Sequence, residues 1–268
     1  MIRLTVKEEP PVRVSLAGIA PEGLAQKSDV EIARRPLIVG SRRSTLGDWF
    51  AVERAGDEPD LVFEGPCRRF DCIGAEMSSG SLRVAGDAGA YVGLGMKGGR
   101  ILVEASAGYG VATAMNGGEI RIRGDVGDGL GGALPGNRAG MRGGTVTVDG
   151  SAGRGCGDRL RRGLIIVAGD VGIGCGTRMS AGTIVVGGRA ARYAGLAMRR
   201  GTIVVLGGVE SIAPSFADAG IQDLVFIRLM ARMLAGHGFA DLGRRLGPLQ
   251  CWQGDLAMRG NGEIFIGR

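Results

Sequence analysis

The chain has 268 residues, of which 52 are glycine, more than twice the ordinary share of roughly 7%. Glycine does not recur at every third residue, which excludes a collagen-like triple helix, and a hydrophobic content of 44% argues against a flexible linker. The 33 basic and 27 acidic residues leave a net charge of +6, and all basic residues except Lys7, Lys27 and Lys97 are arginine. By charge alone, nucleic acid, an acidic protein and an acidic ligand all remain open as partners.

Residues 1–58 are not repetitive; we expect strands near 2–6 and 12–16, followed by a mixed segment. The first residues lack the apolar stretch of a signal peptide, and no apolar run reaches the roughly 18 residues of a membrane span. We therefore expect a cytoplasmic protein without a membrane partner. Five cysteines with no CxxC pair, and a single histidine, predict neither a disulfide framework nor a metal site.

An internal repeat with a period of about 19 residues, the signature of a stacked architecture, follows this segment. Methionine or leucine recurs once in each unit, at a constant spacing with one longer interval, at Met77, Met96, Met115, Met141, Leu160, Met179 and Met198. Three positions after each comes a glycine, then two aliphatic residues spaced by two, then in six of the seven units a second glycine. This alternation predicts a short strand with two inward side chains, and the glycines fit turns or the close approach of neighbouring coils.

Nineteen residues at about 3.3 Å each give a perimeter below roughly 63 Å, which fits one coil of a β-solenoid and is too short for a repeat containing a helix. We predict an all-β chain, built as a single-stranded right-handed parallel β-helix with coils of about 19 residues. An N-terminal non-repetitive segment precedes it and a C-terminal helix-containing insertion follows. The predicted segments are 1–58 (mixed N-terminal segment), 59–208 (β-helix), 209–257 (helical extension packing on the β-helix) and 258–268 (closing strand).

Stacking turns each position of the repeat into a column. The outward column of the strand is polar in early coils and apolar in later ones, where it holds Ile166, Val185 and Val204. Such a stripe needs a cover; we expect a helix over 221–234 to fold back on it, with a partner subunit as the alternative. Cys156 and Cys175 share an inward column, where the spacing permits a disulfide but an intracellular setting favours reduced thiols.

Basic residues gather at the Met/Leu corner of the later coils. Stacking would bring them within roughly 5 to 10 Å of each other along one edge. Two interpretations are open: a solvated face, or a site for an anionic ligand or acidic partner, where bidentate arginine chemistry favours carboxylates or phosphates. The candidate residues for binding a polyanion are Arg142, Arg159, Arg161, Arg162, Arg178, Arg199 and Arg200.

No catalytic group emerges from the motifs. The longer interval adds a short insertion within a glycine-rich loop over 128–140, a natural contact element that lacks the GK[ST] of a phosphate-cradling loop. His237 has no Ser, Cys or His partner at a recognisable spacing and is interpreted as a helix-end residue. Asp87, Asp125 and Asp170 are interpreted as turn formers. The few aromatic residues argue against a base-stacking surface, so we expect no nucleic-acid partner.

The repeat Met-x-x-Gly-x-[ILV]-x-[VI]-x-Gly-x-x-Gly, over roughly residues 60–208, resembles the GxGxG β-helix domain of glutamate synthase and of the C subunit of formylmethanofuran dehydrogenase. The flanks favour the second family: residues 31–32, 38–40 and 46–52 are similar to the segment that precedes its helix, and residues 254–257 and 262–266 to its end. The composition, rich in arginine and alanine, is typical of a GC-rich bacterium. The chain therefore most resembles the C subunit of the bacterial formyltransferase/hydrolase complex.

The resemblance implies a non-catalytic structural subunit of a complex that converts formyl-tetrahydromethanopterin to formate via formylmethylofuran. It implies a hetero-oligomer with an amidohydrolase-like metal subunit, a formyltransferase subunit and a further subunit. It also implies polyglutamylated methylofuran as the carrier, whose tail the arginine edge would contact. The alternatives are the C subunit of a methanogen-type formylmethanofuran dehydrogenase, an enzyme with a cryptic site such as the glycine-rich loop, and a glutamate-synthase-type module that transmits signals between sites.

Overall fold

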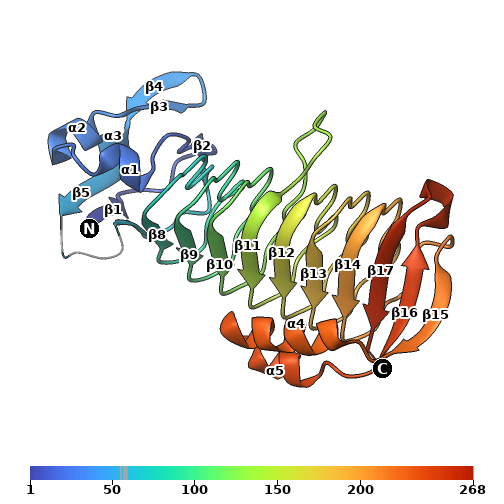
Figure 1. Ribbon diagram of the computed structural model, residues 1–268. Coiled ribbons are helices and arrows are strands. Elements are labelled where there is room, and N and C mark those ends of the chain that lie inside the picture. The colour runs from blue at the N-terminus through green and yellow to red at the C-terminus, as the bar shows by residue number, and fades with distance from the viewer. Residues whose placement is uncertain (55, 57–59, 268) are drawn as a thin grey trace.

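The computed structural model describes residues 1–54, 56 and 60–267, and its centre is a row of parallel strands (Figure 1). The strands are β6 (Leu61–Glu64), β8 (Ser81–Val84), β9 (Arg100–Val103), β10 (Glu119–Ile122), β11 (Arg142–Val148), β12 (Arg162–Val167), β13 (Thr183–Val186) and β14 (Arg200–Val205). Ile101 pairs with Leu82 on one side and with Ile120 on the other, each one repeat away. Ile120 pairs with Val146, across the longer interval. The repeat therefore sets the register of the sheet.

A second line of contact joins the coils outside this row. Parallel bridges run in sequence through Cys67, Ala88, Ala107, Val126, Ala152, Val171, Ala190 and Val209. The aspartates expected to form turns also link coils, because Asp87 Oδ1 accepts a hydrogen bond from the backbone N–H of Ser106 at 2.9 Å and Asp170 Oδ1 one from that of Arg189 at 2.7 Å. The chain is thus mostly β, with a large and mostly parallel sheet in a β-helix-like arrangement.

The interior is built from the columns that the repeat predicts. All seven Met/Leu corner residues are fully buried, as are inward strand residues such as Val103, Ile165 and Ile184. Cys156 and Cys175 are both fully buried in the same column and are free thiols in this structure. With few aromatic side chains, the core consists of aliphatic residues and methionine in layers.

The N-terminal residues close one end of the sheet. Strand β1 (Ile2–Val6) confirms the first expected strand; it pairs in parallel with β6 and antiparallel with β5 (Phe50–Arg54). The second expected strand is reduced to β2 (Val14–Ser15), which pairs with β7 (Phe70–Asp71). A hairpin of β3 (Pro36–Val39) and β4 (Arg42–Thr45) projects from the body (Figure 1), and the short helices are α1 (Pro21–Leu24), α2 (Asp29–Ala33) and α3 (Leu46–Trp49).

The C-terminal residues extend the other end. Strand β17 (Asn261–Ile266) pairs in parallel with β14, and two antiparallel strands follow outward, β16 (Leu249–Gly254) and β15 (Ala217–Gln222). A short 3-10 helix, η1 (Leu256–Met258), lies between β16 and β17. The 13-stranded sheet has the order β15-β16-β17-β14-β13-β12-β11-β10-β9-β8-β6-β1-β5.

The helix predicted over 221–234 is displaced towards the C-terminus: α4 spans Val225–Gly236 and α5 spans Ala240–Arg244. Ile221 instead belongs to β15 and pairs with Gln250, because β16 takes up the backbone hydrogen bonds of 221–222. The local sequence pattern, from which the helix was predicted, contains no information about pairing with a strand as distant in the chain as Leu249–Gly254. None of the described helices is long and apolar enough to cross a membrane.

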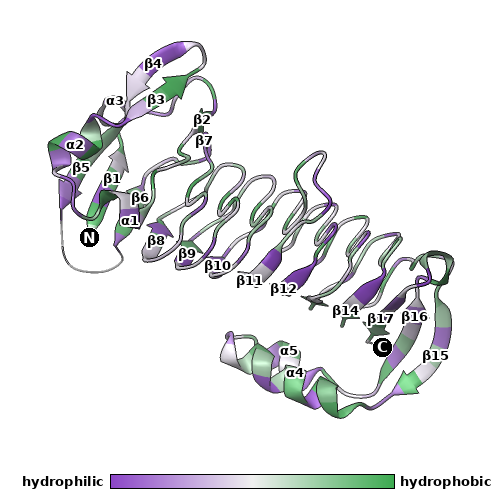
Figure 2. Ribbon diagram, turned by 45° about the horizontal axis from the view of Figure 1, so that its top comes forward, coloured by the Kyte–Doolittle hydropathy of each residue, from purple (hydrophilic) through white to green (hydrophobic). Residues whose placement is uncertain are grey.

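Helix α4 covers the apolar outer stripe, as we expected. Its buried residues Ile227, Met230 and Leu234 form one cluster with residues of the outward column, among them Ile166, Val185, Val204 and Phe265. Figure 1 shows α4 and α5 lying along the later part of the row of strands, and Figure 2 shows that α4 alternates apolar and polar segments. The amphipathic helix therefore buries the stripe within the chain.

Close stacking makes some glycines necessary, and a matched pair of variants tests this. At Gly144 (φ +87°) an added Cβ would lie 2.6 Å from the carbonyl oxygen of Gly118 in the neighbouring coil, whereas at Gly136 (φ +81°) it would meet no atom within 4 Å. Gly136→Ala should cost about 1–2 kcal/mol of unfolding free energy, from backbone strain alone. Gly144→Ala should cost clearly more in the same denaturant titration. Equal losses would contradict this packing argument.

Candidate functional site

Six arginines line one groove of about 790 Å³ at the corner of the later coils. They are Arg138, Arg159, Arg161, Arg162, Arg178 and Arg199; Ser180, Ala181, Ala197 and Met258 complete its wall. We call this the arginine groove. Five of the seven candidate residues are thus brought together. Arg142 and Arg200 are not on its wall; in the sheet Arg142 is in register with Arg162, and Arg200 with Asn261.

The stacked backbone sets the positions of these side chains. Arg159 and Arg178 occupy one position of the repeat, and the backbone N–H of each donates to the following coil, to the carbonyls of Thr177 and Leu196. Both have left-handed backbone, with φ of +57° and +55°. Glycine would adopt this conformation without the strain that an arginine carries. The fold therefore holds these two arginines at a small cost in stability.

The inserted loop supplies the end wall of the groove. Figure 1 shows the loop leaving the row of coils just before β11. Arg138 reaches the groove from this loop, and the Arg159 guanidinium donates to the carbonyl of Asn137. Arg138 and Met258 were not among the predicted residues, because neither follows the repeat. The position of the insertion could have indicated Arg138, because the insertion lies directly before the corner at which the columns of basic residues begin.

Positive charge in the groove is only partly compensated. Arg178 donates to Asp158 Oδ1 through Nε at 3.0 Å and through Nη2 at 2.8 Å, and Arg159 Nε lies 3.9 Å from Asp158 Oδ2. Within residues 1–54, 56 and 60–267, no carboxylate lines the groove and Arg138, Arg161, Arg162 and Arg199 make no ion pair. The groove therefore carries an excess of positive charge, and guanidinium groups suit carboxylates and phosphates.

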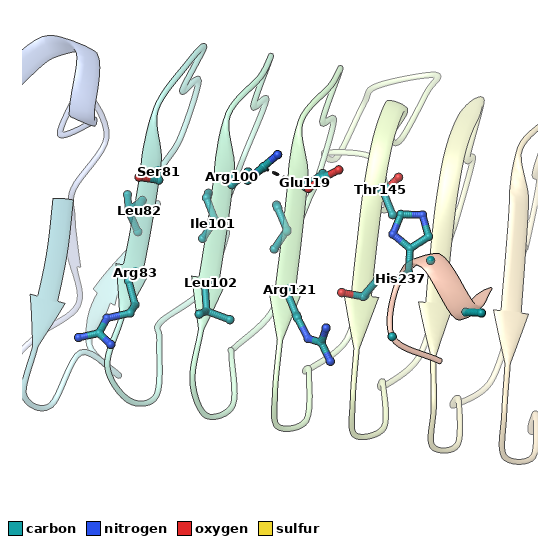
Figure 3. Close-up of a pocket in the computed structure, with 15 residues that line it drawn as sticks. Ser81, Leu82, Arg83, Arg100, Ile101, Leu102, Glu119, Arg121, Thr145 and His237 are labelled. Atoms are coloured by element: carbon teal, nitrogen blue, oxygen red, sulfur yellow. Dashed lines mark ion pairs between the residues drawn. The ribbon is translucent and has the colours of Figure 1, made fainter. Parts of the chain in front are cut away.

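A second cavity of about 870 Å³ lies on the outer face of β8–β11, beside the end of α4 (Figure 3). Its charges are already paired: Arg83 with Glu104 at 3.3 Å, Arg100 with Glu119 at 3.4 Å, and Arg121 with Asp149 at 3.1 Å. His237 stands at its edge as the C-cap of α4, which confirms its interpretation as a helix-end residue. The arginines of this cavity are thus paired with carboxylates, unlike most of those in the arginine groove.

Four of the five cysteines are buried, and Cys72 is partly buried. Burial raises the pKa of Cys67 to about 12 and that of Cys251 to about 11. A hydrogen bond with Cys175, together with burial, raises the pKa of Cys156 well above its usual value. The raised pKa values disfavour the thiolate, which is the reactive form of cysteine. In the part of the chain that the structure describes, no three His, Cys, Asp or Glu side chains gather as a metal site.

No protein-family model matches the chain. Among curated proteins it is 41% identical over 89 residues to the C subunit of the formyltransferase/hydrolase complex Fhc of Methylorubrum extorquens, covering 33% of each chain. It is 37% identical over 98 residues to the C subunit of tungsten-containing formylmethanofuran dehydrogenase 2 of Methanothermobacter marburgensis, covering 35% of this chain and 36% of that protein. These matches span about a third of the length of the curated relatives.

A solved structure extends the likeness to the full length. It is the crystal structure of the formyltransferase/hydrolase complex FhcABCD from Methylorubrum extorquens with methylofuran; one of its chains matches with a TM-score of 0.92 and 41% identity over 99% of both chains. The chain belongs to the family of C subunits of formyltransferase/hydrolase complexes and formylmethanofuran dehydrogenases. The family resemblance predicted from the repeat and its flanks is confirmed.

If this C subunit keeps its arginines for binding rather than for folding, removing one should not destabilise the chain. Arg178→Gly relieves left-handed strain of about 1–2 kcal/mol. It also removes an exposed ion pair with Asp158, which contributes about 0–1 kcal/mol. We expect an unfolding free energy that is unchanged or slightly higher, measured by denaturant titration. A loss above about 1 kcal/mol, more than such an ion pair contributes, would show that Arg178 is mainly structural.

Proposed function

We propose that this chain is a non-catalytic structural subunit of a one-carbon transfer complex that converts formyl-tetrahydromethanopterin to formate via formylmethylofuran. The observation that carries the proposal is the likeness over 99% of both chains to a chain of the FhcABCD structure. The chemistry of the described residues supports it, since the carboxylates beside the second cavity are tied in ion pairs and four of the five thiols are buried. The partners would be an amidohydrolase-like subunit, a formyltransferase subunit and a further subunit, in the cytoplasm.

The second candidate is the C subunit of a methanogen-type formylmethanofuran dehydrogenase. The curated tungsten-containing relatives favour it, at 37% identity for that of Methanothermobacter marburgensis. The bacterial complex is preferred because its subunit is 41% identical in the curated comparison and a chain of its crystal structure matches over the full length. A cryptic enzyme and a glutamate-synthase-type module have no comparable support.

For the organisation of the subunit, we propose that residues 59–208 form a single-stranded right-handed parallel β-helix. Residues 1–58 would close one end, residues 209–257 would act as an extension packed on the helix, and residues 258–268 would add the closing strand. The constant offset of one repeat between paired strands and the packing of α4 on the outer stripe support this division. A rigid stack of this kind suits a scaffold, because each coil is held by its neighbours.

We further propose that the arginine groove contacts the polyglutamate tail of the methylofuran carrier. Six guanidinium groups face a groove without lining carboxylates, and glutamate side chains are the carboxylates that such groups bind well. The neighbour FhcABCD was crystallised in complex with methylofuran, so a carrier is present in that complex. The scaffold would then hold both the catalytic subunits and the carrier that moves between them.

Activity of the isolated chain separates a scaffold from a cryptic enzyme. The purified chain alone should show no formyl transfer from formyl-tetrahydromethanopterin and no hydrolysis of formylmethylofuran, whereas the complex isolated through a tag on this chain should show both. Hydrolysis is measured as formate release, and transfer as consumption of formyl-tetrahydromethanopterin in the presence of methylofuran. Turnover by the isolated chain, at a rate comparable with that of the complex, would overturn the non-catalytic assignment.

Carrier retention tests the arginine groove. The fourfold variant with Arg159, Arg161, Arg162 and Arg178 each replaced by Gln loses four charge contacts, each worth about 0.5 kcal/mol at an exposed site, so bound carrier should fall about tenfold to thirtyfold. The complex is isolated through the tagged chain, and carrier is quantified by mass spectrometry after release.

A matched control removes the same charge elsewhere: Arg34, Arg42, Arg43 and Arg123 are exposed and lie outside the groove. Their replacement by Gln should leave carrier content near that of the unchanged complex. Subunit stoichiometry, measured on the same samples, must stay constant in the groove variant. Unchanged carrier content in an intact groove variant would refute the proposed contact.

A further inference from the structure

Helix α4 is apolar on two sides. Its inner side, with Ile227, Met230 and Leu234, is buried against the outward column of the sheet. On its other side, Val225 is 70% exposed and Leu229 is 57% exposed. These two positions are four residues apart and are therefore neighbours on one helix face. A surface helix ordinarily keeps its outer face polar, so α4 departs from the pattern of a helix that borders only water.

The exposed apolar surface extends past the start of the helix. Ile221, on the edge strand β15, is 51% exposed, and Leu224, which directly precedes α4, is 36% exposed. We call Ile221, Leu224, Val225 and Leu229 the apolar ridge. Single exposed aliphatic residues are normal on a protein surface, whereas several together mark a contact with another protein.

Basic residues flank the apolar ridge, and the carboxylates near them are already engaged. Arg228 is paired at 3.2 Å with Asp223, which is the only acidic residue in α4 and the four residues before it. On α5, Asp241 is paired with Arg244. Arg232, three positions after the last residue of the ridge, is exposed and makes no ion pair within residues 1–54, 56 and 60–267. The surface therefore combines exposed aliphatic side chains with a free positive charge.

The sheet holds this surface rigidly in place. The inner side of α4 packs on Ile166, Val185 and Val204 of three successive coils, and Figure 1 shows the helix on the outside of the stack. A partner that docks on a preorganised surface loses less conformational freedom than one that must order it. The ridge shares no residue with the arginine groove, which lies at the turns before the strands.

We propose that the apolar ridge and Arg232 are a docking surface for a different subunit of the hetero-oligomer. The partner would cover Val225 and Leu229 with an apolar cleft and place a carboxylate beside Arg232, since complementary charge fixes the orientation of such contacts. A second copy of this chain fits less well, because two facing ridges would bring their arginines together while Asp223 is engaged by Arg228. The inference rests on the proposed function in that the chain must belong to a complex of several subunits.

Photo-crosslinking from the ridge identifies the occupant. The photoreactive amino acid p-benzoylphenylalanine replaces Leu229 in the tagged full chain, the assembled complex is isolated and irradiated, and crosslinked peptides are identified by mass spectrometry. We expect crosslinks to one other subunit, at a segment with apolar residues and at least one Asp or Glu. The same replacement at Ile38, 69% exposed on the hairpin of β3 and β4, should not label that segment. Crosslinks only to a second copy of this chain, or to no subunit of the assembled complex, would overturn the proposal.

Polar substitution measures the contribution of the ridge. Val225→Gln combined with Leu229→Gln should raise the dissociation rate of the crosslinked subunit about tenfold to hundredfold, measured by subunit exchange followed with native mass spectrometry. Both side chains are exposed in the single chain, so its denaturant midpoint should not change. The matched control, Val30→Gln with Ile38→Gln, alters side chains that are 59% and 69% exposed elsewhere and should leave the rate unchanged. An unchanged rate in the ridge variant would refute the docking surface.

Charge substitution at one position tests the expected carboxylate. Arg232→Gln should weaken the association of the same subunit about twofold to fivefold, and Arg232→Glu should weaken it further by repulsion, whereas Arg232→Lys should stay within about twofold. Equal affinities of the Glu and Lys variants would show that no carboxylate faces Arg232.

The outcomes separate this inference from the proposed function. If the complex transfers and hydrolyses formyl groups but the ridge neither crosslinks to a partner nor responds to substitution, the docking surface fails and the proposed function stands. If the ridge crosslinks to a different subunit in a complex that lacks both activities, the docking surface stands and the proposed function fails.

Discussion

Parallel hydrogen bonding between successive coils is the constraint on which the structure depends. Each strand pairs with the strand one repeat away, so residues at the same position of the repeat lie directly above one another. With strands about 4.8 Å apart, a side chain on the wrong part of the coil meets the backbone of its neighbour. At Gly140, for example, a Cβ would lie 2.6 Å from the carbonyl oxygen of Asp158. The abundance of glycine follows from this spacing.

Because residues at the same position of the repeat stack in columns, the same constraint also determines which parts of the surface are polar and which are apolar. A column is uniformly polar or apolar only if several successive repeats carry the same kind of residue at that position. Here the outward column changes along the stack, from Arg83, Leu102 and Arg121 in early coils to Ile166, Val185 and Val204 in later ones. The chain covers the apolar part with α4 and leaves the polar part open, where each arginine is paired with a carboxylate. Burial by a helix and pairing of charges are thus two solutions to the exposure of a single sheet face.

How much the sequence could predict depends on whether a feature repeats. The register, the buried corner methionines and the gathering of Arg159, Arg161 and Arg178 all follow from the period of the repeat. The conformation of Ile221 could not be read in this way, since its strand depends on pairing with Gln250 far along the chain. Arg138 and Met258 enter the groove through an insertion and a closing turn, whose conformations are set by tertiary contacts rather than by the period.

The two cavities show why unpaired charge, rather than charge itself, marks the candidate site. Arg83 and Arg121 lie on strands and find carboxylates of the neighbouring coil, so their field is largely cancelled at short range. The arginines of the groove lie at a turn, and Arg159 and Arg178 keep left-handed backbone that glycine would adopt without strain. Asp158 compensates only this pair. The strain at Arg159 and Arg178 and the repulsion among the arginines are thus offset only in part within the described part of the chain, and the acidic carrier tail that we propose as partner would lower the free energy of this surface.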